Sequence, residues 1–392
     1  MVKTLGQFMT PSDLANFVAS QLSPSDTIID LAAGDGSLLR AAGHAYPRAK
    51  LLGYDIDDAM VKKANQIPNV AVSRKDGLRA LIPSEFARSP TCVIGNPPFL
   101  PFGNAERKWI EKAFPNLGGK RGTERAEVHF LARALVVASK SGGRVVFVMP
   151  IGFADGDTYR NVRAALMEEY ALIRCVEVIG NPFSETEART VVIVVDTQKK
   201  SAQVTEISEF DVTTGHVSKV IDAALPPGSR LDARYHRALQ RNGSHDSPQL
   251  KDLKVSVTRG LVSRKEAEER NVIALHTTHI SKAASRGTIR ARFKLSEEQL
   301  ENQVIARKGD ILLSRTGSRV SWAPVLLSEG AVPITDHVFR IRAAKEVRNL
   351  VIDSFRHPSF SGWLSGISKG VCATVITKRE LLEMPVFAWE TN

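Results

Sequence analysis

Residues 27–37 read TIIDLAAGDGS, and this stretch decides how the N-terminal half of the chain folds. Residues 27–31 form a short apolar run containing one acid, as expected of a buried β-strand that leads into a tight turn. Gly34 and Gly36 have no Cβ atom, so the backbone there can turn sharply and approach a ligand closely. A helix is expected at 38–45, with its first N–H groups facing that ligand. Strand, glycine turn and helix together predict the first unit of an α/β sheet.

Strand-like and helix-like segments continue to alternate after this unit. The expected strands are apolar and rich in β-branched residues, at 50–54, 70–73, 91–95, 144–149, 172–179 and 190–196. The expected helices show apolar residues at helical spacing, at 57–66, 128–139 and 159–170. Strands without polar alternation are typical of a sheet buried on both faces. We therefore predict an α/β fold with right-handed crossovers, in which ligands bind at the carboxyl ends of the strands.

Length and composition limit the class of protein. The chain has 392 residues, and about 150 residues per domain predicts two to three domains. Cys92, Cys175 and Cys372 are too scattered for a disulfide scaffold or a zinc site, so we expect no metal. No apolar stretch approaches the roughly 20 residues that cross a bilayer, and the N-terminus lacks a signal pattern. We expect a cytoplasmic protein that does not engage a membrane.

The net charge of +11 is unevenly distributed. Residues 1–224 carry 26 Lys and Arg against 25 Asp and Glu, whereas residues 225–392 carry 27 against 17. A linker-like segment, ALPPGS at 224–229, lies at this boundary. We predict two domains, 1–224 and 225–392. The basic excess of the second favours a polyanionic partner, with solubility alone as the alternative.

Three acids follow three successive predicted strands: Asp30, Asp55 and Asp76. Acids along one sheet edge suit a nucleoside, and Asp55 is placed to accept the hydroxyls of a ribose. The alternative for Asp55 is to cap the next helix, a part that Asp57 can also play. No G-x-G-x-x-G or phosphate-loop motif is present, and Asp35 in the glycine turn would repel a pyrophosphate. The pattern favours S-adenosylmethionine, with its ammonium beside Asp30, over a nicotinamide or phosphorylated nucleotide; a plain tight turn is the remaining alternative.

The fourth predicted strand runs into Asn96-Pro97-Pro98-Phe99. Two prolines fix two φ angles and remove two N–H donors. The Asn96 side-chain oxygen and the Pro97 carbonyl are then two rigid acceptors, able to bind both hydrogens of an amino group. Phe99 is placed to stack on a planar ligand. The alternatives are a turn residue for Asn96 and a core residue for Phe99.

The order of these motifs resembles that of the DNA adenine-N6 methyltransferases of the amino-methyltransferase class, in the gamma-class order. The matching segments are GQFMTP at 6–11, the glycine turn at 30–36, Asp55, Asp76, NPPF at 96–99, and NPF at 181–183 before the last strand. The resemblance covers residues 6–196. It departs at 31–34, where LAAG replaces the Pro-Ala-Cys-Gly common in that family.

This resemblance implies a Rossmann-like S-adenosylmethionine-dependent methyltransferase sheet followed by a C-terminal α+β target-recognition domain. It implies a cofactor site of Phe8, Thr10, Pro11, Asp30, Ala32, Gly34, Gly36, Asp55, Ile56, Asp76, Gly77 and Asn96. It implies catalysis by Asn96, Pro97, Phe99 and Phe183 on an adenine rotated out of the duplex. Phe183 would pack against the base, or alternatively belong to the core.

The C-terminal part supplies candidate DNA contacts at Arg259, Arg264, Arg286, Arg290 and Arg292. In TIRARFK at 288–294 the cations alternate, so one strand face would track phosphates or be merely solvated. Residues 308–318, KGDILLSRTGS, resemble a segment of the target-recognition domains of type I restriction specificity subunits. That resemblance implies DNA contacts from Ser314, Arg315 and Thr316. The HTTH at 276–279 has no acid or cysteine at ligand spacing, so it does not predict a metal site.

The function expected from these features is site-specific methylation of adenine N6 in double-stranded DNA, within a restriction–modification system. No nuclease constellation stands out, so a restriction endonuclease would be a separate protein. Monomer and dimer are both open. The alternatives are an RNA or protein-glutamine methyltransferase, and a DNA-specificity protein without catalytic activity.

Overall fold

The computed structural model describes residues 9–83, 90–102, 107–180, 183, 189–242, 248–291, 303–316, 322–367 and 375–387. The chain forms two compact units, Met1–His236 and Arg237–Asn392. No helix in these ranges combines the length and apolarity needed to cross a bilayer.

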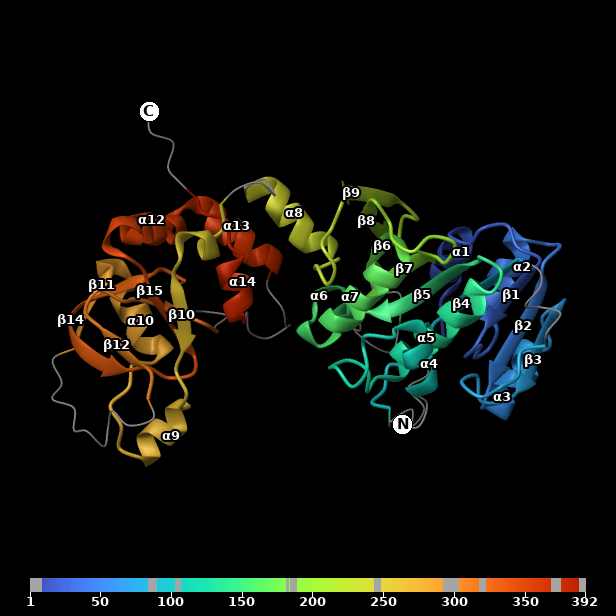
Figure 1. Ribbon diagram of the computed structural model, residues 1–392, viewed down its shortest axis with the longest axis horizontal. Helices are drawn as coiled ribbons and strands as arrows, with labels where there is room; N and C mark the ends of the chain where they lie inside the picture. The colour runs from blue at the N-terminus through green and yellow to red at the C-terminus, as the bar shows by residue number, and fades with distance from the viewer. Residues whose placement is uncertain are drawn as a thin grey trace. The chain divides into compact units, whose positions relative to one another are not determined.

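Nine strands within the described part of the first unit form one sheet, in the order β3-β2-β1-β4-β5-β7-β6-β8-β9 (Figure 1). Neighbours from β3 to β5 are parallel, and β7 inserts antiparallel between β5 and β6. The strands are β1 (Thr27–Asp30), β2 (Lys50–Asp55), β3 (Val70–Arg74), β4 (Thr91–Gly95), β5 (Arg144–Pro150), β6 (Ala171–Ile179), β7 (Thr190–Asp196), β8 (Thr205–Asp211) and β9 (Val217–Ala223). This is the predicted Rossmann-like sheet, with the hairpin β8–β9 added at one edge.

Helices cover both faces of this sheet. One face carries α1 (Ser12–Ser20), α2 (Ser37–Ala45) and α3 (Asp58–Ala64), whose buried residues share one hydrophobic cluster. The other face carries α4 (Arg107–Ala113), α5 (Ala126–Ser139), α6 (Ile151–Asp155), the 3₁₀ turn η3 (Asp157–Tyr159) and α7 (Arg160–Glu169). The sheet is therefore the middle of three layers.

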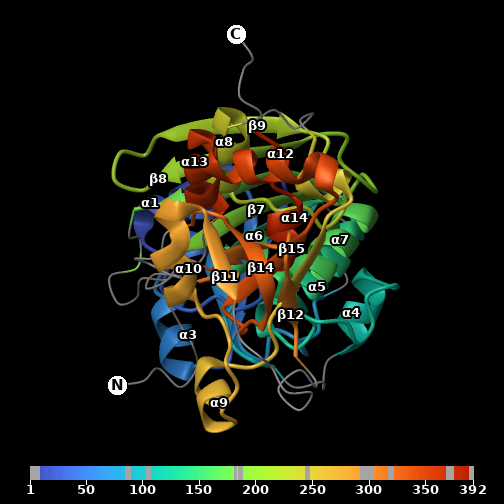
Figure 2. The same cartoon turned by 90° about the vertical axis from the view of Figure 1, so that its left-hand side faces the viewer.

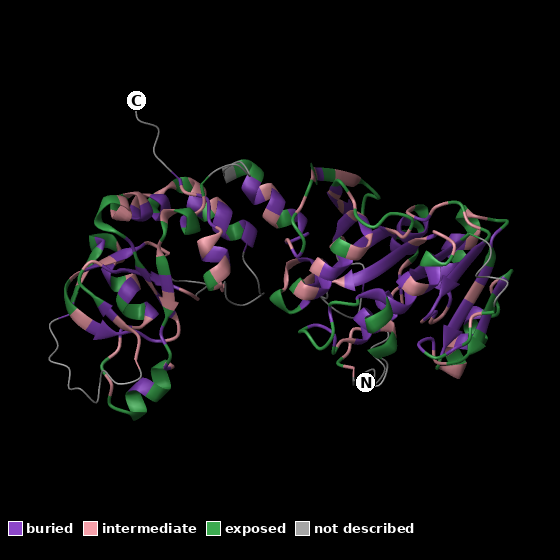
Figure 3. Cartoon of the chain, viewed as in Figure 1, coloured by how far each residue is buried: buried purple, intermediate pink, exposed green. Residues whose placement is uncertain are grey.

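Successive residues of the central strands enter these two cores alternately. Val145 and Phe147 of β5 pack with the cluster around α5, whereas Val146 and Val148 pack with the cluster around α2. The central strands are accordingly buried along most of their length (Figure 3). The unbroken apolar runs predicted this burial on both faces.

The boundary between the units lies between residues 236 and 237. The ALPPGS segment predicted it between residues 224 and 225. The residues that follow this segment are anchored to the first unit. Arg163, fully buried on α7, donates from Nε to the carbonyl of Ser229 at 2.8 Å, and Ala233 donates its N–H to Glu177 at 3.1 Å. Leu231 is part of the core around α5. The proline-rich segment is thus a turn on the first unit.

The second unit combines a mixed sheet with helices (Figure 2), as predicted for an α+β fold. The strand order is β10-β15-β13-β14-β11, and β12 also pairs with β14. The strands are β10 (Ser256–Arg259), β11 (Thr288–Ala291), β12 (Ile305–Arg307), β13 (Ile311–Ser314), β14 (Val325–Pro333) and β15 (Val338–Arg342). The helices are α8 (Ala233–Asn242), which begins in the first unit, η4 (Leu250–Leu253), α9 (Arg264–Glu269), α10 (Thr277–Ala283), η5 (Ala284–Arg286), α12 (Lys345–Arg356), α13 (Pro358–Ile367) and α14 (Lys378–Leu382).

Gly143, directly before β5, provides a test of the close contact between β4 and β5. A Cβ atom at Gly143 would overlap the backbone carbonyl of Thr91, whereas one at Gly118 would have no heavy atom within 4 Å. We expect Gly143→Ala to lower the free energy of unfolding by about 1–3 kcal/mol or more. Gly118→Ala should leave it within about 0.5 kcal/mol. Urea unfolding measures both, and equal midpoints for the two variants would contradict this packing.

Candidate active site

The register of the parallel strands places three polar side chains at one sheet edge. Asp30, the last residue of β1, pairs with Gly53 of β2 and with Ile94 of β4. Asp55 and Asn96 each follow these partners by two residues. Since β2 and β4 flank β1, the two side chains lie on either side of Asp30. The strand order reverses here, at the position where α/β sheets open a ligand crevice.

The glycine turn after β1 is tied to the end of β2. Gly34 has φ of +53° and Gly36 has φ of +79°, which glycine adopts at little cost. The N–H of Gly34 donates to Oδ2 of Asp55 at 2.7 Å, and Oδ1 of Asp55 accepts from the N–H of Asp57. Asp57, whose side chain accepts from the N–H groups of Ala59 and Met60, is the cap of α3. Capping therefore belongs to Asp57, and Asp55 orders the turn.

Asp30 carries an unsatisfied buried charge. Its side chain is 1% exposed, and Oδ1 accepts a hydrogen bond from the N–H of Ala32 at 2.9 Å. Oδ2 has no hydrogen-bond partner among the described residues. Burial raises the pKa of this carboxyl to about 7, and the negative charge of Asp55 adds to the rise. A cationic group beside Oδ2 would reverse this penalty.

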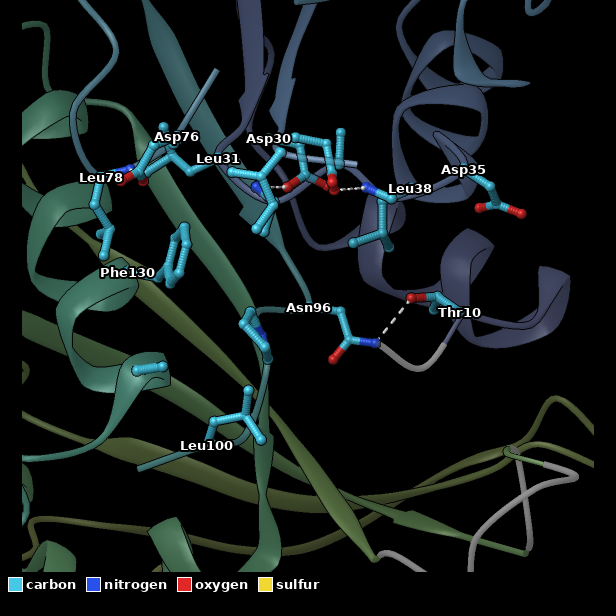
Figure 4. Close-up of a pocket in the computed structure, with 18 of the residues that line it drawn as sticks. Thr10, Asp30, Leu31, Asp35, Leu38, Asp76, Leu78, Asn96, Leu100 and Phe130 are labelled. Carbon is cyan, nitrogen blue, oxygen red and sulfur yellow. Dashed lines mark hydrogen bonds between the residues drawn. The ribbon is translucent and has the colours of Figure 1, made fainter. Parts of the chain in front are cut away.

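These elements line a cavity of about 260 Å³ (Figure 4). Of the predicted cofactor residues, those that line it are Thr10, Asp30, Ala32, Gly34, Asp55, Ile56, Asp76, Gly77 and Asn96. Two others do not line it: Pro11 is the N-cap of α1, and Gly36 is the N-cap of α2. Phe8 lies outside the described residues.

Apolar residues that the motifs did not reveal complete the cavity. Leu38, Leu78, Phe102 and Phe130 line it together with the polar groups, and Ile56 is 53% exposed at its margin. Phe130 comes from α5, which the sequence predicted only as a helix. Its inward position follows from tertiary packing and has no local signal beyond helical spacing.

One aromatic and one cationic side chain, Trp109 and Arg133, hydrogen-bond to the backbone of the loop after Asp76. Trp109 donates from Nε1 to the carbonyl of Leu78 at 2.8 Å. The buried guanidinium of Arg133 donates to the carbonyls of Gly77 and Ala80 and lies 5.0 Å from the Trp109 ring centre. This support fixes one wall of the cavity.

Asn96 lies at the end of β4, at the rim of the same cavity. Its Nδ2 donates to Oγ1 of Thr10 at 3.1 Å, and its amide oxygen points away from Thr10 (Figure 4). The segment that follows is paired with the start of α5: the N–H of Phe102 donates to Glu124, and the N–H of Ala126 donates to Leu100. Both sides of the NPPF segment are therefore fixed by long-range bonds.

The predicted aromatic partners are not among the described residues that line the cavity. Phe99 is half-buried and packs against the hydrophobic cluster that includes Phe183. Phe183 is 5% exposed, and Pro97 is buried. The structure thus brings Phe99 and Phe183 to one cluster, with Phe183 in a core position.

Comparison with known proteins assigns the family. The sequence profile described as N-6 DNA Methylase matches residues 1–219, more than half of the chain. The chain belongs to the N-6 DNA methylase family. Type II methyltransferase M.XamI of Xanthomonas campestris pv. amaranthicola is 27% identical over 179 residues, which cover 42% of this chain and 33% of that protein.

Solved structures with a related fold include two restriction–modification proteins. The type I methyltransferase subunit of Streptococcus thermophilus has a TM-score of 0.45 and 20% identity, covering 61% of this chain and 53% of that one. The type IIG restriction endonuclease BpuSI has a TM-score of 0.47 and 13% identity, covering 97% of this chain and 58% of that one. The chain spans about a third of the length of the curated relative and little more than half of the length of these structures.

Membership of this family supports S-adenosylmethionine as the methyl donor, and the residues present fit it. The unpartnered Oδ2 of Asp30 suits the cofactor's ammonium, and Asp55 suits ribose hydroxyls. The apolar side chains of Ile56 and Leu78 suit a nucleobase. Bound there, the cofactor would supply an electrophilic methyl group.

In the second unit, the predicted DNA contacts separate into two groups. Arg286 and Arg290 are exposed beside and on β11, and Arg290 lies 3.9 Å from Glu329. Arg259, Arg264, Arg315 and Thr316 lie at the ends of β10 and β13 and the start of α9. Arg292 lies outside the described residues.

The KGDILLSRTGS segment divides into a structural half and a surface half. Asp310 is 3% exposed and accepts two hydrogen bonds from Arg342, each at 2.8 Å. Ser314 is fully buried on β13, which contradicts the expected DNA contact, because the strand's own packing encloses it. Only Arg315 and Thr316 of the predicted trio reach the surface.

The pKa of Asp30 makes cofactor affinity depend on pH. The ionised carboxylate attracts the ammonium, so affinity should rise from pH 5.5 to 7.5 as Asp30 loses its proton through its pKa of about 7. Asp30→Asn should bind more weakly and show no such rise. Isothermal titration of S-adenosylmethionine measures the effect.

Asp35→Asn is the matched control for this titration. Burial opposes the ionisation of Asp35, but hydrogen bonds from Ser37 and the ammonium of Lys63 hold its pKa below the ordinary value. Asp35 therefore does not titrate in this window, and the variant should keep the wild-type pH slope. A flat wild-type profile, or a rise retained in Asp30→Asn, would refute the role given to Asp30.

Proposed function

We propose that this protein is a site-specific DNA methyltransferase that transfers a methyl group from S-adenosylmethionine to N6 of an adenine in double-stranded DNA. The observation that carries the proposal is the position of Asn96, at the rim of the cofactor cavity with its amide nitrogen bonded to Thr10. The family assignment supports N6 of adenine as the acceptor.

Asn96 acts as a hydrogen-bond acceptor in this scheme. The bond to Thr10 keeps the amide nitrogen on the far side, so the amide oxygen is presented to the amino group of the base. The Pro97 carbonyl is the second acceptor. Two acceptors localise the nitrogen lone pair, which is otherwise conjugated into the ring, and they match the positive charge that develops on nitrogen. The scheme requires no covalent enzyme intermediate and no side-chain general base.

The target base must leave the duplex to reach Asn96, which costs a few kcal/mol of stacking. We assign the stacking surface to Phe99, two residues beyond the acceptor pair. Phe183 supports the same hydrophobic cluster from its buried position. Positioning rather than acid–base chemistry then supplies most of the rate.

The remaining assignments follow from this activity. We propose that residues 237–392 form the target-recognition domain and that the enzyme acts in the cytoplasm on chromosomal DNA. Restriction–modification is the proposed context, since relatives of known function belong to such systems. A separately encoded restriction endonuclease would then recognise the same site.

Replacing Asn96 tests the chemistry. We expect Asn96→Ala to lower the methylation rate by roughly 10²–10³-fold or more, because a preorganised acceptor is lost. The control is Asn16→Ala, an exposed asparagine on α1, which should methylate like wild type. The measurement is transfer of labelled methyl groups to genomic DNA, followed by sequencing that maps N6-methyladenine.

Each alternative function predicts a different result. Label found in RNA or in a protein glutamine, with none in DNA, would support those alternatives. Wild-type protein that binds DNA but no cofactor would be a specificity protein. Methylation unchanged in Asn96→Ala would exclude the mechanism.

A further inference from the structure

Three segments of the second unit converge at the ends of β10 and β13. The N–H of Arg315, after β13, donates to the carbonyl of His337 at 2.8 Å. The N–H of Asp336 donates to Val262, just after β10, at 2.8 Å, and the N–H of Gly260 donates to Val338. The turn before β15 thus lies between the other two segments.

The loop before α10 joins the same place, because the N–H of Thr335 donates to the carbonyl of Leu275 at 3.0 Å. This brings His276 beside His337, with ring centres 5.8 Å apart. We call the resulting group the recognition cluster. It consists of Arg259, Leu261, His276, Arg315, Thr316, Asp336 and His337.

Two cations of the recognition cluster lie together without a carboxylate partner. Arg259 and Arg315 form no ion pair with any described residue, although Asp336 is near enough to influence Arg315. Partial burial and the positive charge of Arg259 hold the pKa of Arg315 below its ordinary value. Like charges held side by side are unfavourable, and an anionic or acceptor-rich ligand would relieve this cost.

The neighbouring Arg264 differs, because its Nε bonds to Glu268 at 2.8 Å along α9. It is therefore neutralised locally. The two uncompensated guanidiniums belong to the recognition cluster itself.

The histidines of the recognition cluster are fixed in orientation. Nδ1 of His337 lies 2.6 Å from Oγ1 of Thr316, and Nδ1 of His276 lies 2.8 Å from Oγ1 of Thr277. Nε2 of His337 lies 3.7 Å from Oδ1 of Asp336, so this ring lies between Thr316 and Asp336. No group of three or more His, Cys, Asp or Glu residues in the described ranges could hold a metal ion.

An exposed apolar side chain lies among these polar groups. Leu261 is 65% exposed, although Gly260 is bonded to Val338 at the start of β15 and Val262 to Asp336 in the turn before it. Exposure of a large apolar side chain at a backbone position held by neighbouring hydrogen bonds adds nothing to the hydrophobic core. Apolar contact with a thymine methyl, or insertion at a base step, is a known use of such a residue.

Among the described residues around β11, the exposed cations are not accompanied by a large exposed apolar side chain. Arg286 and Arg290 are exposed cations near β11, and Arg290 is close to Glu329. Phosphates require only cations, whereas base edges require donors, acceptors and apolar groups in fixed positions. The two groups therefore differ in the part of DNA that they suit.

We infer that the recognition cluster reads base edges of the target sequence, with Arg315 as its principal guanidinium donor and Leu261 as its apolar contact. This inference rests on the proposed function, and it names the residues that make the methylation site-specific. Arg286 and Arg290 add affinity without sequence information.

The test measures sequence discrimination by the full-length protein. Wild type is used to select preferred sequences from random duplexes, and Kd is then measured for preferred and scrambled duplexes. Discrimination is measured as the Kd for the scrambled duplex divided by the Kd for the preferred duplex. We expect Arg315→Ala and Leu261→Ala to lower this ratio roughly 5- to 150-fold, the range for one base contact. Arg315→Lys keeps the charge but not the planar fork, so it should retain binding to scrambled DNA and lose discrimination.

The double variant Arg286→Ala and Arg290→Ala is the matched control, since it removes two arginines of the same unit. It should weaken both duplexes equally and leave the ratio unchanged. Cofactor affinity, measured separately, should be the same in all variants and reports that the first unit is folded.

Three results would overturn the inference: discrimination retained in Arg315→Lys and Leu261→Ala, discrimination lost only in the double variant, or preference of the wild type for RNA. Failure of the proposed function gives a different pattern. Wild type that discriminates between duplexes but transfers no methyl group would refute the proposed activity, and the variants would still test the recognition cluster.

Discussion

The pairing of β1 with a parallel strand on each side is the constraint on which the active site depends. Asp30 is paired with both Gly53 and Ile94, so the backbone register alone places Asp55 and Asn96 on either side of it. The register is maintained by two cores, because successive residues of the central strands enter opposite hydrophobic clusters. If one strand shifted its register by one residue, its side chains would turn to the opposite hydrophobic cluster. Moving the site would therefore require both cores to repack.

This rigidity allows the cavity to hold an unsatisfied charge. Asp30 is almost fully buried with one oxygen unpartnered, an arrangement that a flexible loop would relax by admitting water. Here the carboxylate is bonded to Ala32, and the adjoining turn is bonded through Gly34 to Asp55. Electrostatic attraction to a carboxylate buried to this degree is stronger than attraction to one in solvent. The unfavourable free energy of burying the ionised Asp30 carboxylate is relieved when a cation binds beside it.

Much of the first unit could be predicted from sequence, since unbroken β-branched runs mark central strands wherever they occur. The strands at Thr91–Gly95 and Thr190–Asp196 have the predicted bounds. Features set by distant contacts could not be predicted. The bond from Arg163 to Ser229 attaches the residues after the proline-rich segment to the first unit, so the boundary lies later than predicted. Phe130 lines the cavity because of how α5 packs on the sheet. The burial of Ser314 likewise depends on its strand neighbours, which its motif does not contain.

The basic excess of the second unit illustrates how charge and specificity differ. Several of its arginines are neutralised within the fold: Arg342 binds Asp310, Arg379 binds Glu383 and Arg264 binds Glu268. Such residues raise the count of cations, while part of their charge is compensated by a neighbouring carboxylate. The excess over the whole unit therefore governs long-range attraction, which is screened by salt and blind to sequence. In the proposed function, discrimination between sequences comes from donors that form no ion pair with the described residues and whose positions the backbone fixes, as at Arg259 and Arg315.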